Sequence, residues 1–170
     1  AELAKLHAAY WQHPDLPTAS WLFDRKSGAA QAAATQLAAA AEFRGRYTGR
    51  IASACLDAID HFAVHAESIV RELPDGATLI HGEPRVDNVL FEDLAEGHRA
   101  WLIDWQFADH GSPMFDLAYF LAGSVSAADR RAIEDELIAA HQAVIAHVDP
   151  GYSLDRARAE LLGRLPLLDV

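Results

Sequence analysis

Residues 78–120 constrain the fold more than any other part of the sequence, because short apolar runs alternate there with clustered polar residues. Two runs, Thr78–Ile80 and Val89–Phe91, flank a polar loop, and a third run, Ala100–Ile103, is followed by Asp104. Runs this short, rich in branched residues and bounded by Gly, Pro or Asp, predict strands rather than helices. The segment EDLAEGH between the last two runs is typical of a hairpin connection. Polar residues are therefore expected where strands end, on loops of the kind that commonly hold catalytic residues.

The loop and the hairpin bring oxygen-bearing side chains together. We expect Glu83 and Asn88 on one loop and Asp104 at the end of the next hairpin, which places two carboxylates and one amide in a small volume. Such hard ligands suit Mg²⁺, which keeps several waters and completes its coordination with substrate phosphates. A carboxylate that is not needed as a ligand can orient or deprotonate a hydroxyl. Phosphoryl transfer requires these groups.

Length and composition predict one folded unit over residues 1–170. The sequence is 51% hydrophobic and contains four Trp and seven Phe, which excludes a disordered chain. The formal charge of −11 argues against nucleic acid or an anionic membrane as a partner. It favours a cationic substrate only weakly, because acidity also serves solubility.

Cysteine content and hydropathy indicate the cellular compartment in which the protein is expected. Cys55, the single cysteine, excludes an internal disulfide and suits a reducing compartment. The sequence shows neither a secretory signal pattern nor a run of about 18 apolar residues. We therefore expect a cytoplasmic protein.

Apolar residues at helical spacing predict a mainly helical chain around these strands. Cys55 lies on the apolar stripe of the third predicted helix, so we expect a buried thiol. Ser112, Ser126 and Ser153 are expected N-caps. The predicted helices cover residues 1–11, 28–43, 51–73, 113–121, 126–144 and 153–165.

Two motifs, HGEPRVDNVLF and LIDWQFADHGSPMFDLAYFL, resemble the catalytic core of the aminoglycoside phosphotransferase and choline kinase group, small-molecule kinases distantly similar to protein kinases. The resemblance implies an α+β, mainly helical C-terminal lobe of a protein-kinase-like fold, in which a small β-hairpin carries the catalytic loop. It implies that Asn88 and Asp104 hold Mg²⁺ and that Glu83 stands at the position of the catalytic base. ATP is then the co-substrate, and the acceptor is a hydroxyl of a small molecule.

The resemblance also implies roles for the neighbouring residues. Leu90 and Ile103 would form the floor under the adenine, whereas His81 and Asp116 would support the catalytic loop. Arg85 would either help to neutralise the transferring phosphoryl group or form a simple salt bridge with an acid such as Asp87.

The sequence departs from the family pattern at two points. The base is usually Asp, and the extra methylene of Glu83 moves the carboxylate outward by about 1.5 Å; an error of about 1 Å can cost roughly a hundredfold in rate. The nucleotide-covering N-terminal lobe is also missing, because no glycine-rich phosphate motif is present and neither lysine, Lys5 nor Lys26, follows a suitable strand pattern. We therefore expect a C-terminal lobe that has little activity alone, and the first residue, Ala1, fits a fragment.

Two other readings remain open at this stage. A non-catalytic kinase-like module that binds a ligand or a partner is favoured by Glu83 and the missing lobe. A metal-dependent hydrolase is also conceivable, with its site built from residues that have metal-binding side chains: His81, Asp87, Asp104 and His110. The acceptor is open as well, since an antibiotic, a choline-like amine, a sugar and a sterol-like alcohol all fit.

Overall fold

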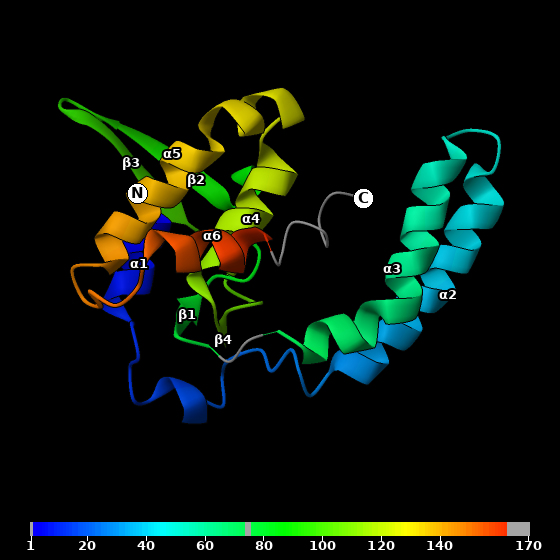
Figure 1. Ribbon diagram of the computed structural model, residues 1–170, viewed down its shortest axis with the longest axis horizontal. Coiled ribbons are helices and arrows are strands. Elements are labelled where there is room, and N and C mark those ends of the chain that lie inside the picture. The colour runs from blue at the N-terminus through cyan, green and yellow to red at the C-terminus, as the bar shows by residue number, and fades with distance from the viewer. Residues whose placement is uncertain (1, 74–75, 163–170) are drawn as a thin grey trace. The chain divides into compact units, whose positions relative to one another are not determined.

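The computed structural model describes residues 2–73 and 76–162, which form six α-helices and two antiparallel strand pairs (Figure 1). The predicted mainly helical α+β class is thereby confirmed. The helices are α1 (Glu2–Ala9), α2 (Ala29–Tyr47), α3 (Ser53–Arg71), α4 (Pro113–Ser124), α5 (Ala127–Ile145) and α6 (Leu154–Leu162). The strands are β1 (Thr78–Ile80), β2 (Val89–Leu94), β3 (Gly97–Leu102) and β4 (Asp109–Gly111), and short 3₁₀ turns cover Leu16–Thr18 and Val86–Asn88.

The chain divides into two compact units. One contains the described residues 2–23 and 76–162, and the other contains residues 24–73. All strands lie in the first unit, together with helices α1, α4, α5 and α6. The sequence had predicted a single unit.

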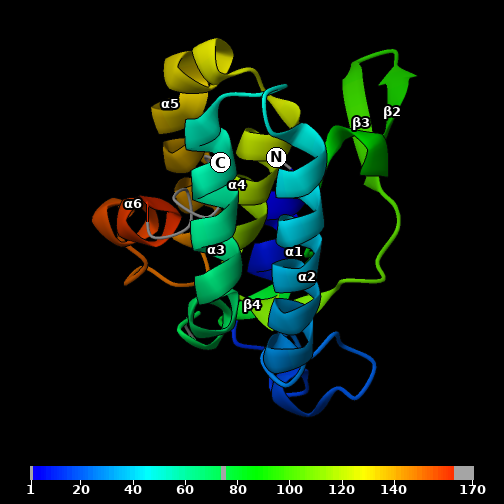
Figure 2. The same ribbon diagram turned by 90° about the vertical axis from the view of Figure 1, so that its right-hand side faces the viewer.

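The second unit is a pair of helices, α2 and α3, that lie side by side (Figure 2). Alanine dominates α2 and favours a helix through its propensity, and its small side chain allows a neighbouring helix to approach closely. Arg44 of α2 reaches across to Asp57, at 2.7 Å, and to Asp60 of α3. Hydrogen bonds to these two carboxylates raise the pKa of the Arg44 guanidinium.

The prediction of a buried thiol at Cys55 is wrong, because this side chain is exposed. The buried residues of α3 are Leu56, Ala63 and Ala66. Leu56 and Ala63 each follow a member of the predicted stripe, Cys55 and Phe62, by one residue, whereas Ala66 of that stripe is buried as predicted.

Helix α4 lies at the centre of the first unit, where it contacts α1, α5, α6 and β1. Ser112 caps it by accepting a hydrogen bond from the N–H of Met114, and Pro113 occupies its first position. Its nearly all-round apolar sequence suits this central place. Buried apolar residues form the core between α4, α5 and α6: Met114, Leu117, Ala118, Leu121, Ile138, Ile145, Tyr152, Ala157 and Leu161.

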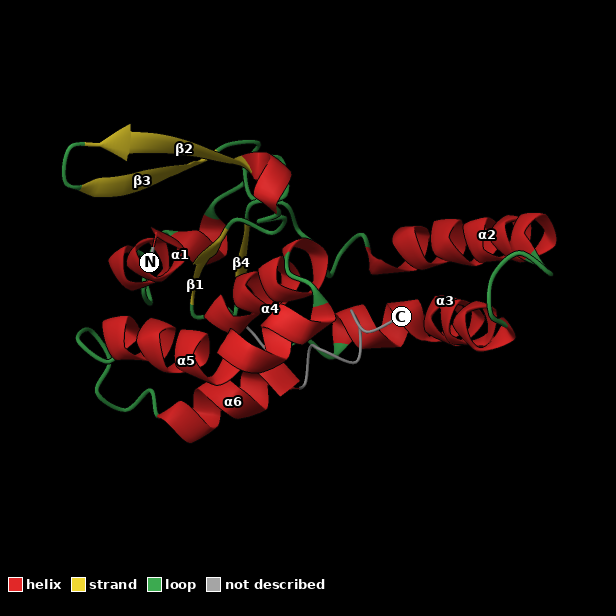
Figure 3. Cartoon of the chain, turned by 90° about the horizontal axis from the view of Figure 1, so that it is seen from above, coloured by secondary structure: helices red, strands yellow, loops and turns green. Residues whose placement is uncertain are grey.

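The strands form two separate pairs (Figure 3). β1 pairs with β4, with Thr78 opposite Gly111, whereas β2 pairs with β3, with Val89 opposite Leu102. The bounds of β1 agree with the prediction. The hairpin strands are longer than predicted, since they take up most of EDLAEGH, and Ile103 falls just outside β3. β4 was not predicted.

The helices agree with their predicted positions to within a few residues. The expected caps at Ser126 and Ser153 are present, because each hydroxyl accepts a hydrogen bond from a backbone N–H in the first turn of its helix. The predicted continuation of α6 to residue 165 lies outside the described residues. Among the residues that the structure describes, no helix is both long enough and apolar enough to cross a membrane.

Gly76 shows how closely the backbone segments meet at the edge of the β1–β4 pair. A Cβ atom at this position would lie 2.5 Å from the carbonyl carbon of His110 and 2.6 Å from the nitrogen of Gly111. Backbone cannot move aside as a side chain can. We therefore expect Gly76→Ala to lower the free energy of unfolding by about 2 kcal/mol, measured by urea denaturation.

Gly123→Ala is the matched control, because a Cβ there meets nothing within 4 Å and the residue lies in helix α4. We expect this variant to be as stable as the native protein or more stable, since alanine favours helix. Equal stability of the two alanine variants would show that the close approach at Gly76 relaxes freely.

Candidate functional site

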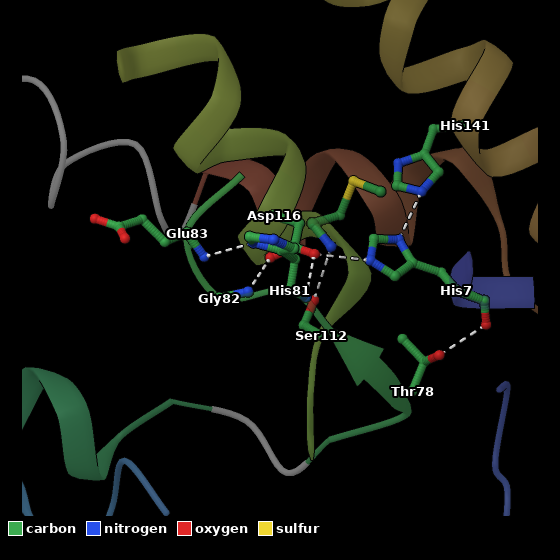
Figure 4. A network of polar contacts seen from close by, with 9 residues as sticks. His7, Thr78, His81, Gly82, Glu83, Ser112, Asp116 and His141 are labelled. Carbon is green, nitrogen blue, oxygen red and sulfur yellow. Dashed lines mark hydrogen bonds and ion pairs between the residues drawn. The ribbon is translucent and has the colours of Figure 1, made fainter. Parts of the chain in front are cut away.

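The loop after β1 is attached to helix α4 through the carboxylate of Asp116 (Figure 4). One oxygen, Oδ2, accepts the backbone N–H of His81 at 2.7 Å, and Oδ1 accepts the backbone N–H of Gly82 at 2.9 Å. Asp116 and His81 are fully buried. Gly82 has a φ of 85°, a left-handed conformation that glycine adopts without strain. The loop therefore leaves β1 through a turn whose two amides converge on one buried carboxylate.

The imidazole of His81 connects this loop to the end of the hairpin. Its Nε2 donates to the carbonyl oxygen of Ile103 at 2.8 Å, and its Nδ1 accepts the backbone N–H of Glu83 at 3.3 Å. These partners together define one neutral tautomer, with the proton on Nε2. The ring also lies against Trp105, with ring centroids 4.8 Å apart. His81 thus fixes the spacing between the loop and the residue that precedes Asp104.

Two more histidines complete the buried polar network beneath the loop (Figure 4). His7 of α1 places its Nε2 3.1 Å from Oδ2 of Asp116 and its Nδ1 2.9 Å from Nε2 of His141 in α5. The hydroxyl of Thr78 donates to the carbonyl oxygen of His7 at 2.7 Å. Burial, together with the nearby His7, lowers the pKa of His141 to about 2. His141 is therefore neutral at pH 7 and donates its Nε2 proton toward His7.

The backbone and the side chain of Glu83 are each held by another residue. Its carbonyl oxygen accepts a hydrogen bond from Nδ2 of Asn88 at 3.0 Å, which closes the loop upon itself. Its carboxylate oxygen Oε1 accepts a hydrogen bond from the hydroxyl of Tyr119 at 3.2 Å. The side chain is half-buried and points away from Asp116 in Figure 4. The loop thus presents a carboxyl group outward (Figure 4).

Asn88 is joined through its backbone to Ile103, the residue that precedes Asp104. The carbonyl oxygen of Asn88 accepts a hydrogen bond from the backbone N–H of Ile103 at 3.0 Å. Asp104 follows Ile103 directly in the chain. Asp104 adopts a left-handed conformation, with a φ of 63°. Since Nδ2 of Asn88 is engaged with Glu83, its Oδ1 is the atom left to bind a cation.

The donor set fits Mg²⁺. It combines an amide oxygen with the carboxylate of Asp104, which is exposed to solvent and accepts a single long hydrogen bond, 3.4 Å, from Gln106. Magnesium is usually held by one or two protein carboxylates, with waters and phosphates as its other ligands.

The remaining candidate residues lie around this centre. Leu90 and Ile103 are exposed, at 55% and 37%, so both can be reached by a ligand that covers the hairpin. Arg85 forms a salt bridge with Asp87, 2.6 Å from its nearest carboxylate oxygen, and both side chains face solvent. This hydrogen bond raises the pKa of the Arg85 guanidinium. The sequence left two roles open for Arg85, neutralising the transferring phosphoryl group or forming a salt bridge with an acid such as Asp87. The structure contains this salt bridge.

The hypothesis of a metal-dependent hydrolase requires a cluster of metal-binding side chains. Within residues 2–73 and 76–162, no group of three His, Cys, Asp or Glu side chains is arranged to hold a metal ion. His81 is buried and engaged with Ile103 and Glu83, and His110 lies in β4 opposite Leu79. The four residues proposed for that reading therefore do not converge.

Sequence reasoning missed three residues that contact this network. None of the three, His7, Tyr119 and His141, was among the site residues predicted from the sequence. A signal existed for Tyr119, because it follows Asp116 by three residues in a helix and therefore faces the same side. His7 and His141 are 134 residues apart, and no local pattern connects them.

The chain matches a protein-family model. The model of the Ecdysteroid kinase-like family matches residues 19–148, about three-quarters of the chain. This family is part of the aminoglycoside phosphotransferase and choline kinase-like group of phosphotransferases. The comparisons with curated proteins and with solved structures each gave no match.

Asp116 allows a direct test of the loop attachment. In Asp116→Asn, an amide NH₂ replaces one acceptor oxygen and faces a buried backbone N–H or His7. We expect the free energy of unfolding to fall by about 3 kcal/mol, because a buried donor loses its partner and a charged acceptor is removed. Urea denaturation measures this, with the exposed Asp155→Asn as the control. Similar stability of the two variants would mean that the loop does not depend on the carboxylate.

Burial of neutral His141 predicts a pH-dependent stability. The unfolded chain protonates this residue near 6.5, whereas the folded chain does so only near pH 2. Between these values the unfolded state binds the extra proton, so stability falls as the pH falls. From pH 7 to pH 5 this residue should account for a loss of about 2 kcal/mol.

Urea denaturation of His141→Gln across this range isolates the effect. We expect a shallower decline for this variant than for the native protein. His147→Gln, which changes an exposed histidine just beyond the end of the same helix, should keep the native decline. If His141→Gln declined as steeply as the native protein, the pH dependence would have another origin.

Proposed function

This chain belongs to the Ecdysteroid kinase-like family, and we propose that it is the C-terminal lobe of an ATP-dependent phosphotransferase that acts on a hydroxyl of a small molecule. The observation that most supports this proposal is the arrangement around the loop. Glu83 and Asn88 share one loop that Asp116 holds from below, and Asn88 is paired with the residue that precedes Asp104. Phosphoryl transfer depends mainly on positioning and charge neutralisation. The loop would supply the positioning, and a magnesium ion held by Asn88 and Asp104 would supply the positive charge.

Glu83 orients the acceptor hydroxyl and takes its proton. The acceptor oxygen forms a bond to the terminal phosphorus of ATP, while the bond from that phosphorus to the bridging oxygen breaks and ADP leaves. The proton of the hydroxyl passes to the carboxylate of Glu83, whose side chain points outward from the loop (Figure 4). A general base in this position typically contributes about 10²–10⁴ in rate.

Asn88 and Asp104 would hold Mg²⁺ through an amide oxygen and a carboxylate. The ion would supply positive charge to the phosphates of ATP. On the protein side, the pairing of Asn88 with Ile103 sets the separation of the two ligands, and His81 sets the position of Ile103 through its hydrogen bond. Neither contact uses a ligand oxygen, so the ligands are placed before any ion binds.

The nucleotide needs surfaces on both sides. We propose that Leu90 and Ile103, both exposed, form the floor under the adenine. The covering surface and the lysine that contacts the phosphates come from an N-terminal lobe outside this sequence, as in kinases generally. Arg85 is paired with Asp87 and is also attracted by the charge of Glu83, so we propose for it a secondary part beside the base.

The acceptor is proposed only as a class, an alcohol. The name of the family points to a polyhydroxylated steroid, and this compound class therefore belongs in an acceptor screen beside aminoglycosides, choline-like amines and sugars. The alternative is a kinase-like module that binds nucleotide without turnover. Glu83, at a position where the group usually has Asp, favours this alternative, and so does the missing nucleotide-covering lobe.

The test is calorimetric titration of the full-length protein with ATP, in the presence and absence of Mg²⁺, followed by the acceptor screen. We expect Asp104→Ala to abolish magnesium-dependent binding, because it removes the carboxylate ligand. Glu83→Gln should keep binding and lower kcat by about 10²–10⁴-fold, because it removes the base and leaves the loop intact.

Two substitutions on the exposed hairpin strand β2 serve as controls. Asp93→Ala and Glu92→Gln make the same chemical changes outside the loop, and both should leave binding and turnover unchanged. Native protein that binds no ATP would exclude the kinase proposal. Magnesium-dependent binding without turnover of any acceptor would establish the non-catalytic module.

A further inference from the structure

Helix α4 contacts the catalytic loop at a second point, through Tyr119. The hydroxyl of Tyr119 donates to Oε1 of Glu83 at 3.2 Å. Tyr119 follows Asp116 by three residues, so both side chains leave α4 on the side that faces the loop. Asp116 binds the backbone of the loop, and Tyr119 binds the side chain that the loop presents. We propose that Tyr119 is a positioning residue for Glu83, which fixes one carboxylate oxygen and leaves the other to receive the proton of the acceptor.

The rest of the network does not serve this purpose, because it acts on the backbone. The N–H of Glu83 is bound to His81 and its carbonyl oxygen is bound to Asn88. Beyond its Cα atom, the side chain still has three rotatable bonds, and glutamate is among the residues with the most rotamer freedom to lose. In Figure 4 this side chain points away from the Asp116 carboxylate. An anchor near the tip is therefore needed to define where the carboxylate stands.

The need for this anchor is specific to glutamate. An aspartate at position 83 would end about 1.5 Å shorter, too short to keep the 3.2 Å contact to the Tyr119 hydroxyl. An aspartate also has one rotatable bond fewer, so a fixed backbone defines its carboxylate more closely. The effect of the Tyr119 hydroxyl must therefore depend on which acid occupies position 83, and a double-mutant cycle measures this dependence.

The inference rests on the proposed function, and the first experiment uses the full-length protein with ATP, Mg²⁺ and an acceptor from the screen. Tyr119→Phe removes the hydroxyl and keeps the ring. We expect kcat to fall about tenfold to a hundredfold, the range that a displacement of about 1 Å can produce. The KM for ATP should change less than about twofold, since the nucleotide lies on other residues. In the Glu83→Asp background, the same substitution should change kcat less than about twofold.

The matched control is Tyr152→Phe, which removes another tyrosine hydroxyl that donates to a glutamate. Tyr152 donates to Glu160 at 3.1 Å, in the core between α4, α5 and α6. This variant should lose stability and keep the native kcat, which separates loss of a hydrogen bond in the fold from loss of one at the base.

The kinetic outcomes distinguish the two proposals. A native kcat in Tyr119→Phe, while Glu83→Gln lowers kcat by about 10²–10⁴-fold, would overturn the role of Tyr119 and leave the kinase function intact. An equal loss in the native and the Glu83→Asp backgrounds would likewise overturn it, since the hydroxyl would then act independently of the glutamate.

A crystal structure of Tyr119→Phe provides a readout that does not require turnover. We expect the carboxylate of Glu83 to leave its native position while the backbone of His81 and Gly82 stays in place. A carboxylate that remained in position without the hydroxyl would overturn the proposal, even if no acceptor were phosphorylated. If no acceptor were phosphorylated, the acceptor screen would count against the proposed function, independently of this crystal structure.

Discussion

The contact on which the rest of the site depends is the one between the buried carboxylate of Asp116 and the two backbone amides of His81 and Gly82. A charged acceptor in a dry interior is unfavourable unless it is fully hydrogen-bonded, and the two amides together with His7 meet this requirement. The amides in turn are held in a turn that only a left-handed residue can form. The buried carboxylate of Asp116 therefore depends on the loop for its hydrogen bonds, and the loop depends on the carboxylate for its shape.

This arrangement connects distant parts of the first unit. Asp116 lies in the central helix, His7 in the first helix and His141 in the fifth, so packing of three helices sets the position of one carboxylate. Hydrogen bonds are strongest where water is excluded, and the three side chains are nearly or fully buried. The helical core thus does more than support the loop from below. It fixes the acceptor to which the loop backbone is bound.

The sequence predicts the parts of this protein that depend on local order. The strand β1, the caps at Ser112, Ser126 and Ser153, and the helices follow from apolar spacing and turn residues. The strand β4 could not be predicted, because Asp-His-Gly has no strand pattern and pairs only through its approach to β1. Cys55 was misplaced because apolar residues lie on more than one side of α3, and contact with α2 decides which of them are buried. The support of the loop by Asp116 was expected from the resemblance, whereas His7 and His141 escaped prediction because only tertiary packing brings them to Asp116.

The left-handed backbone at Asp104 restricts what this position can be. For most residues a positive φ brings the Cβ atom too close to the backbone, and glycine, asparagine and aspartate are the usual exceptions. Of these, glycine offers no side-chain ligand and asparagine offers no negative charge. If the position has to bind a cation, its residue must tolerate a left-handed backbone and must also carry a negatively charged ligand. Among these three residues, aspartate alone meets both requirements. Glutamate replaces aspartate without backbone cost at position 83, but at position 104 it would be strained by the left-handed conformation.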